Sequence, residues 1–277
     1  MMKNYSQSPI GIFDSGVGGL SVLKAMRAQM PGEKIIYLGD QVHVPYGPRS
    51  MAELSAFSEE ITRFLLAGGA KLIVVACNSA SAAALPALRD TFPQVPFVGM
   101  EPAIKPAAEQ TRSGMVGVLA TPATFQGALY ASVIERFAHN VTVLQSTCPG
   151  LVEQIEKGQL QAPETESILR QALLPMLAQG IDTLVLGCTH YPFVIPLIKR
   201  IVGENVHVID PAPAIARQTG HLLEAGGLRR PAREKAPVTY YTTAAGETLE
   251  SLLPALTEEG GAVKELRWEN GKLHGVQ

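Results

Sequence analysis

Two cysteines of this 277-residue chain stand in matching contexts. Cys77 follows the aliphatic run Leu72–Ala76, and Cys188 follows the similar run Thr183–Gly187; small polar residues that can open a helix come after each. In open α/β sheets, ligands bind beyond the carboxyl ends of the strands, where backbone N–H groups and the helix dipole stabilise a thiolate. One such cysteine alone is more often merely buried. Two at equivalent positions predict thiols that face one cleft from opposite sides.

Two opposed thiols suit the inversion of a carbon stereocentre. That reaction needs a base that removes the proton on one face and an acid that returns a proton on the other. Because a reversible reaction makes the two groups exchange roles, chemically equivalent residues are suitable, and the reference pKa of cysteine, about 8.5, can be tuned towards physiological pH. The sequence therefore favours acid–base catalysis by Cys77 and Cys188 without a cofactor.

Two neighbouring groups can assist these thiols or bind a ligand. His190 lies two residues beyond Cys188 and can accept or supply its proton. The segment Asp14–Gly19 (Asp-Ser-Gly-Val-Gly-Gly) follows the first predicted strand, so its glycines allow close approach to a ligand and the helix behind it favours an anion such as a carboxylate. Asp14 could equally be a simple helix cap. The segment is not a dinucleotide fingerprint, because Ser21 occupies the third glycine position.

Other readings of these residues are weaker. Cys77, Cys188 and His190 could ligate zinc, but there is no C-x-x-C spacing and no fourth ligand, so no metal is expected. The third cysteine, Cys148, has no counterpart in a matching context and is interpreted as structural. Gly39-Asp40 and the following Val44–Gly47 read, by themselves, as an ordinary Pro/Gly turn.

The elements that must position these residues alternate between strand and helix. Short aliphatic runs predict buried parallel strands, and the longer segments Leu20–Gln29 and Ser50–Leu66 have helical spacing of apolar residues. This alternation predicts βαβ units and a mostly parallel sheet. The predicted strands are Ile10–Phe13, Lys34–Leu38, Leu72–Ala76, Val95–Val98 and, late in the chain, Val238–Thr243.

The pattern also repeats along the chain. Ile10–Ser15, Leu72–Ser79 and Glu101–Ala103 resemble segments that follow in the same order about 110 positions later. We therefore predict an α/β fold of two pseudo-symmetric domains, each a mostly parallel sheet flanked by helices, with the active site in the cleft between them. The first domain would comprise residues 1–100 and 210–277 and carry Cys77; the second would comprise residues 101–209 and carry Cys188.

Composition excludes several classes of protein. A net charge of −2 and a pI near 6.3 give no support to nucleic-acid binding. Three cysteines make a poor disulfide framework and fit reduced thiols in the cytoplasm. Residues 1–8 are polar and lack the apolar core of a secretory signal. The apolar stretch Leu65–Leu88 contains glycine, lysine and proline, so it reads as helix end, turn, strand and new helix, with no membrane span.

These motifs, taken together, resemble the bacterial glutamate racemases. The resemblance covers most of the chain, from residue 8 to about 245, and the motifs follow the family order. The two cysteine motifs combined with the opening Asp-Ser-Gly-x-Gly-Gly make it highly specific. The matching stretches are Phe13–Gly19, Gly39-Asp40 with Pro45–Gly47, Ala76–Ser81, Ala120-Thr121 and Leu186–Pro192.

The resemblance implies a PLP-independent, two-base proton transfer between L- and D-glutamate, supplying D-glutamate for peptidoglycan, in a homodimer without cofactors. By position, Cys77 would be the base towards D-glutamate and Cys188 the base towards L-glutamate, assisted by Asp14 and His190 respectively. Asp40 and Glu156 match further polar positions of the family. Residues that match the family's substrate-binding positions are Asp14, Ser15, Tyr46, Gly47, Asn78, Thr189, His190 and Ser79, the last replacing a usual threonine.

Two alternatives remain open at this point. Another racemase or a decarboxylase of the same superfamily would share the two-domain plan, although the opening Asp14–Gly19 motif resembles the glutamate branch. A two-domain protein that only closes over a small anion would explain the repeat and the glycine loop. It would leave two equivalent cysteines as a coincidence. Solvent deuterium uptake at the α-carbon of a substrate distinguishes the enzyme from the binding protein.

Overall fold

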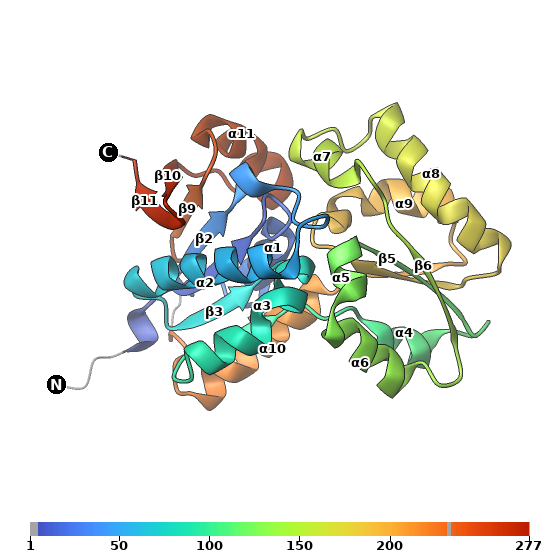
Figure 1. The fold of residues 1–277 in the computed structure, drawn as a ribbon, viewed down its shortest axis with the longest axis horizontal. Coiled ribbons are helices and arrows are strands. Elements are labelled where there is room, and N and C mark those ends of the chain that lie inside the picture. Colours follow the sequence, from blue (N-terminus) through green and yellow to red (C-terminus); the bar gives the residue numbers. More distant parts are fainter. Residues whose placement is uncertain (1–4, 232–233, 277) are drawn as a thin grey trace.

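The computed structural model describes residues 5–231 and 234–276, and its strands form two sheets. The larger has seven strands in the order β11-β10-β9-β2-β1-β3-β4, and the smaller has four in the order β6-β5-β7-β8. All neighbouring strands are parallel except the β10–β11 hairpin. Figure 1 shows the two sheets next to each other, each with its own helices. The predicted α/β class with two mostly parallel sheets is confirmed.

The elements alternate along most of the chain. The strands are β1 (Ile10–Asp14), β2 (Ile35–Gly39), β3 (Leu72–Val75), β4 (Phe97–Gly99), β5 (Met115–Ala120), β6 (Thr142–Ser146), β7 (Thr183–Gly187), β8 (His207–Ile209), β9 (Val238–Thr242), β10 (Val263–Glu269) and β11 (Lys272–Gly275). The α-helices are α1 (Leu20–Gln29), α2 (Met51–Ala67), α3 (Asn78–Thr91), α4 (Ile104–Gln110), α5 (Pro122–Gln126), α6 (Ala128–Phe137), α7 (Leu151–Glu156), α8 (Pro163–Ala178), α9 (Ile195–Val202), α10 (Ala212–Ala225) and α11 (Gly246–Thr257).

The repeat in the sequence corresponds to equivalent strands. The order β2-β1-β3-β4 in the larger sheet is the same as β6-β5-β7-β8 in the smaller one. The similar segments found by sequence therefore fall on β1 and β5, on β3 and β7, and after β4 and β8. In each unit the chain reverses its direction across the sheet between the first and third strands, which is where open parallel sheets bind ligands.

Local sequence explains the elements that lead to this point. All five residues of β1 and all four of β3 are buried, as expected for parallel strands covered on both faces. The predicted helix Leu20–Gln29 is α1, and α2 begins with a capping box in which Ser50 and Glu53 satisfy each other's backbone N–H groups. The predicted strands agree with the observed ones to within two residues at each end.

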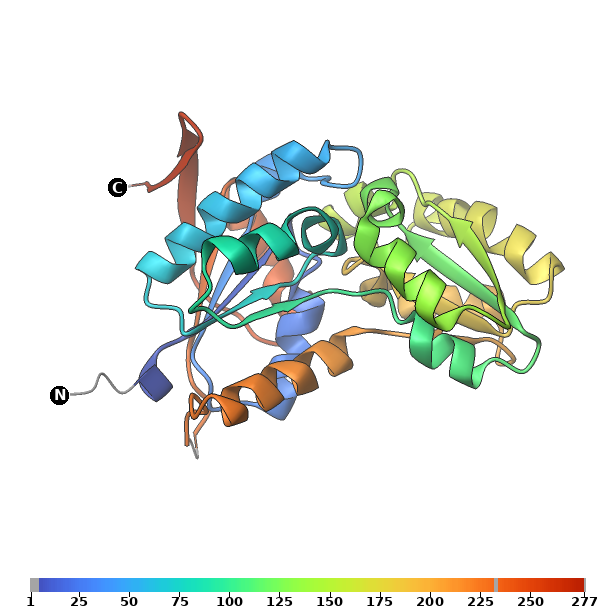
Figure 2. The ribbon, with the colours of Figure 1, turned by 60° about the horizontal axis from the view of Figure 1, so that its bottom comes forward.

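Helices cover both faces of the larger sheet. In Figure 2, α2 and α3 lie above this sheet and α10 lies below it, where α1 packs against α10 and α11. Strands β9 and β10 join this sheet beside β2, so the last part of the chain returns to it. We propose that each sheet with its helices is one domain, with boundaries near residues 100 and 210. The predicted loop Gly226–Pro237 lies before β9, and its residues 232–233 lie outside the described ranges.

The apolar stretch Leu65–Leu88 forms the end of α2, a turn, β3 and most of α3, as predicted. Among the helices in the described residues, none combines the length and the apolar character that crossing a membrane requires. The predicted N-terminal segment is described only from residue 5 onward, where a short 3-10 helix, Tyr5–Gln7, precedes β1.

A buried ion pair connects several segments at the amino ends of β2 and β3. The side chains of Lys71 and Glu33 are 0% and 1% exposed, and Lys71 Nζ lies 2.6 Å from Glu33 Oε2. Lys71 Nζ also donates to the carbonyl oxygens of Ser6 and Leu228, each at 2.9 Å. The other oxygen of Glu33 accepts the backbone N–H of Arg230 at 2.7 Å. The pair therefore anchors the segment before β9 to the start of β3.

Replacing Lys71 by methionine should destabilise the protein by about 3–5 kcal/mol, because Glu33 would remain buried without its cation. Urea denaturation followed by circular dichroism measures this change in the free energy of unfolding. The control is Glu59→Gln, which removes the pairing of Glu59 with Arg63 at the surface, where the loss should stay below about 1 kcal/mol. Equal losses in the two variants would contradict the structural role of the buried pair.

Candidate active site

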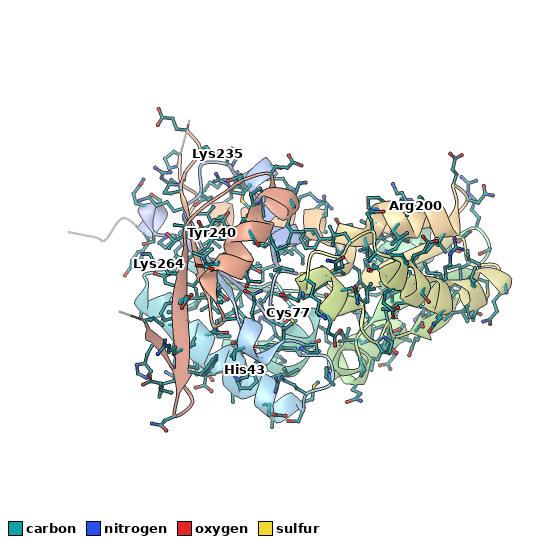
Figure 3. All side chains as sticks on the ribbon, turned by 90° about the horizontal axis from the view of Figure 1, so that it is seen from above. His43, Cys77, Arg200, Lys235, Tyr240 and Lys264 are labelled. Carbon is teal, nitrogen blue, oxygen red and sulfur yellow. The ribbon has the colours of Figure 1, made fainter. Side chains whose placement is uncertain are left out.

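The residues that follow the central strands of both sheets meet at one pocket. Cys77 follows β3 and Cys188 follows β7; both line a pocket of about 200 Å³ together with Thr121, which follows β5. In Figure 3, Cys77 lies near the middle of the molecule, whereas Arg200 lies on the part formed by the smaller sheet and its helices. The ends of two equivalent sheets thus supply one thiol each to the same small pocket.

Most of the predicted site residues line this pocket. Asp14 is the exception: it is fully buried, and it is not among the lining residues. Its carboxyl group accepts hydrogen bonds from the backbone N–H of Gly16 at 3.0 Å and from the hydroxyl of Thr189 at 3.2 Å. Asp14 therefore supports the wall of the pocket through its hydrogen bonds with Gly16 and Thr189, without lining the pocket itself. The predicted residues that line the pocket are Ser15, Tyr46, Gly47, Cys77, Asn78, Ser79, Cys188, Thr189 and His190.

Cys77 is the N-cap of α3. Its sulfur accepts the backbone N–H of Ala80 at 3.5 Å, so the thiol occupies the positive end of the helix. Burial, followed by the nearby charge of Asp14, nevertheless raises the pKa of Cys77 well above its ordinary value. Burial also raises the pKa of Asp14. In the free protein these effects favour a protonated Cys77 and make Asp14 a better proton acceptor than an exposed aspartate.

Cys188 is the first member of a chain of three polar groups. The sulfur lies 3.8 Å from Nδ1 of His190, and Nε2 of the same ring lies 2.6 Å from Glu156 Oε1. Burial acts to lower the pKa of His190, but the hydrogen bonds of the ring with Cys188 and Glu156 outweigh burial and raise it well above its usual range. Burial acts to raise the pKa of Glu156, but its hydrogen bond with His190 lowers it on balance. The ring therefore lies between the thiol and a carboxylate, in surroundings that favour its protonated form.

Glu156 connects His190, which follows β7, with the loops that follow β1 and β2. Although it lies on α7, its Oε1 accepts the backbone N–H of Val17 at 2.7 Å and its Oε2 accepts the side-chain amide of Gln41 at 2.9 Å. The glycine loop after β1 makes room for this contact. A Cβ on Gly16 would collide with the Glu156 carboxylate, and one on Gly18 would collide with the His190 ring. Gly16 and Gly18 thus admit the side chains of Glu156 and His190, in addition to the approach to a ligand that the sequence predicts for this loop.

Unused hydrogen-bonding capacity remains inside the pocket. Asn78 lines the pocket and is 3% exposed, and both of its side-chain polar atoms are buried without a hydrogen-bond partner among the described residues. Such a group costs free energy unless a ligand satisfies it. Nearby, the hydroxyls of Ser79 and Thr121 lie 2.8 Å apart, and Thr124 lies 3.0 Å from Thr121. The pocket can therefore bind a small molecule that carries hydrogen-bond acceptors such as carboxylate oxygens.

Several residues of the site have no role predicted from the sequence. Gln41 and the lining of the pocket by Cys148 were not anticipated, and Thr121 and Glu156 were matched only by resemblance, without a role. Burial raises the pKa of Cys148 to about 12, which keeps this third thiol protonated. Within residues 5–231 and 234–276, no cluster of three or more His, Cys, Asp or Glu side chains is arranged to hold a metal ion.

A second, larger hollow is lined by neither Cys77 nor Cys188. It has a volume of about 1070 Å³ and lies by the starts of β7 and β8, at the opposite end of these strands from Cys188. Its lining includes Asp182, whose carboxylate is held by Thr111 and by backbone N–H groups. The chemistry of the protein is therefore assigned to the smaller pocket.

Comparison with known proteins agrees with this geometry. Residues 10–219 match the sequence model of a family described as Asp/Glu/Hydantoin racemase. Because the match covers well over half of the chain, the protein belongs to this racemase family.

Within the family, the chain groups with the glutamate racemases. It is 50% identical over 256 residues to a glutamate racemase of Roseiflexus, covering 92% of this chain and 94% of the relative. The crystal structure of a Bacillus anthracis glutamate racemase superposes with a TM-score of 0.85 at 33% identity, covering 96% of this chain and 99% of that one. The Escherichia coli glutamate racemase, solved with L-glutamate and an activator, gives a TM-score of 0.81 at 36% identity, covering 92% and 97%.

Proposed function

We propose that this protein interconverts L- and D-glutamate by a two-base proton transfer between Cys77 and Cys188, without PLP or metal. The observation that supports this most is that two thiols in equivalent positions of two sheets line one small pocket. The complexes of related racemases with glutamate support the choice of substrate. A protein that only binds an anion would need neither thiol.

The proposed reaction starts, for L-glutamate, with Cys188 as a thiolate beside the His190 imidazolium. Its sulfur takes the α-proton, the Cα–H bond breaks, and the electron pair is delocalised into the α-carboxylate. Cys77, held as a thiol, then donates its proton to the opposite face of the α-carbon, giving D-glutamate and a Cys77 thiolate. The raised pKa of Asp14 supports a role for this carboxyl group in holding the proton of Cys77. The reverse reaction uses the same groups in exchanged roles.

The proposed substrate contacts follow from the polar groups of the pocket. The unpartnered amide of Asn78, the paired hydroxyls of Ser79 and Thr121, and the N-terminus of α3 can satisfy carboxylate oxygens. Ser15, Tyr46, Gly47 and Thr189 line the same pocket and complete the proposed set. Each polar group left without a partner by a wrong ligand costs about 1–3 kcal/mol.

Incubation with L-glutamate in D₂O tests this proposal. With EDTA present and no PLP added, the D-glutamate formed should carry deuterium at the α-carbon before the remaining substrate does, as measured by NMR. Aspartate is the matched control. Because it is one methylene shorter and leaves a polar group unpaired, its kcat/KM should be about ten- to a hundredfold lower. Binding of glutamate without α-proton exchange would support the binding protein instead, and equal use of aspartate would overturn the glutamate assignment.

Two further parts of the proposal rest on the resemblance to glutamate racemases. We propose that the D-glutamate formed supplies peptidoglycan synthesis, and that the protein acts as a homodimer in the cytoplasm. Growth of a D-glutamate auxotroph that expresses this chain tests the first statement. Light scattering coupled to size-exclusion chromatography tests the second.

A further inference from the structure

We propose that Trp268 and Thr243, from the C-terminal return of the chain, are positioning residues that hold the Tyr46–Gly47 wall of the pocket through Asp40. This inference rests on the proposed function, because the wall belongs to the proposed glutamate pocket. In the sequence, Thr243 and Trp268 are 203 and 228 positions away from Asp40.

Asp40 is fully buried, accepts three hydrogen bonds and lies within hydrogen-bonding distance of the His43 ring. Its Oδ1 accepts the hydroxyl of Thr243 at 2.8 Å and the indole N–H of Trp268 at 2.7 Å. Its Oδ2 accepts the hydroxyl of Tyr46 at 2.6 Å and lies 2.9 Å from Nδ1 of His43. Each of the two carboxyl oxygens therefore has two polar partners. Asp40 thus connects Thr243 and Trp268, on one oxygen, with Tyr46 and His43, on the other.

The two oxygens divide the donors by origin. One oxygen faces the C-terminal return of the chain, and the other faces the loop that forms the pocket wall. Since a carboxyl group is planar, the two donors on Oδ1 determine where Oδ2 lies and hence where the Tyr46 hydroxyl is held. The backbone N–H of Asp40 also donates to the carbonyl of Asp14 at 2.9 Å, which fixes Asp40 beside the site. Thr243 further accepts the N–H of Val42 at 3.1 Å, inside the same loop.

Ring packing offers a competing explanation for any effect of Trp268. The Trp268 ring lies 5.2 Å from the His43 ring and 5.5 Å from the Phe57 ring, measured between centroids. Phe57 also lies 5.9 Å from the Tyr46 ring. Variants must therefore remove the hydrogen bond and the packing separately. Trp268→Phe keeps an aromatic ring and loses the N–H donor, whereas Phe57→Leu keeps the donor and loses the ring.

The experiment measures KM and kcat for D-glutamate, and Kd by calorimetry, in the full-length protein. Trp268→Phe and Thr243→Val should each raise KM and Kd about tenfold, the lower end of the effect of losing a hydrogen bond to a charged group, with a smaller change in kcat. Thr243→Ser, which retains the hydroxyl, should restore wild-type values. Phe57→Leu should leave Kd near wild type. If Trp268→Phe does not fold, the two Thr243 variants test the same oxygen of Asp40.

A double-variant cycle supplies the second readout. Tyr46→Phe removes the donor on the other oxygen, so Tyr46→Phe combined with Trp268→Phe should raise Kd no more than the more severe single change. Additive effects of the two changes on Kd would overturn the proposal. A Thr243→Ser variant with a Kd as high as that of Thr243→Val would also overturn it, and so would a Phe57→Leu variant with a Kd as high as that of Trp268→Phe. Because calorimetry detects binding whether or not racemisation follows, a wild-type protein that binds but does not racemise would contradict only the proposed function.

Discussion

Replacing either Cys77 or Cys188 by alanine should lower racemisation of glutamate by a factor of about 10²–10⁴ or more, because one face of the α-carbon then has no proton carrier. The loss should be the same in both directions, since the two directions share every transition state. Polarimetry or circular dichroism of the amino acid follows the reaction. The structural basis is that both thiols line one pocket, Cys77 after β3 and Cys188 after β7, which are the third strands of their sheets in chain order.

The two variants should differ with a glutamate analogue whose β-substituent leaves after deprotonation. Cys77→Ala retains Cys188 and should still eliminate from the L-like isomer, whereas Cys188→Ala should still eliminate from the D-like isomer. Cys148→Ala is the matched control: it removes the third thiol of the pocket, which a pKa of about 12 keeps protonated and so unable to accept a proton, and should keep both activities. A single variant that loses both isomers, beside one that loses neither, would contradict the two-base mechanism.

Replacing His190 by asparagine should have the second largest effect. Since His190 contacts only one of the two proton carriers, Cys188, elimination from the L-like isomer should fall about 10²–10⁴-fold while elimination from the D-like isomer is largely retained. Net racemisation should fall by a similar factor, because it requires both steps. Equal losses with both isomers would show that His190 supports the pocket as a whole and does not assist one thiol.

The same variant tests whether His190 is charged, through the pH dependence of the free energy of unfolding. The hydrogen bonds with Cys188 and Glu156 outweigh burial and raise the pKa of His190 well above its usual value of about 6.5. A raised pKa in the folded state stabilises the protein fully below the unfolded-state pKa and less as pH rises through the folded-state pKa. The difference in the free energy of unfolding between wild type and His190→Asn should therefore shrink as pH rises above about 6.5. Urea denaturation at a series of pH values measures it, and a constant difference up to pH 9 would contradict the assignment.

The sequence was sufficient for the local elements and for the principal pair of residues. Buried parallel strands read as continuous apolar runs, so β1 and β3 were found from composition alone. The internal repeat then indicated that Cys77 and Cys188 are equivalent, since related segments fold into equivalent strands. His190 was also found, because it lies only two residues from Cys188 and shares its turn.

The return of the chain after β8 was predicted only in outline. Val238–Thr243 was identified as a strand that rejoins the larger sheet, and β9 occupies that place beside β2. The hairpin of β10 and β11 was not predicted, because exposed edge strands with alternating charged residues resemble a solvent-facing tail. Yet this segment brings Trp268 to Asp40.

The sequence by itself determined which residue types stand at the ends of which strands, because strand length and hydrophobic periodicity are local properties of the chain. Tertiary structure alone decided which polar side chains meet across the two sheets. Glu156 reaches His190 from α7, 34 positions away, and Trp268 reaches Asp40 across 228 positions. Such pairings leave no periodic signal, since they depend on how whole sheets and helices pack, and a single glutamate or tryptophan in the sequence is compatible with many partners. The two thiols and His190 were thus visible in the sequence, and the contacts of His190 with Glu156 and of Asp40 with Trp268 became visible only in the fold.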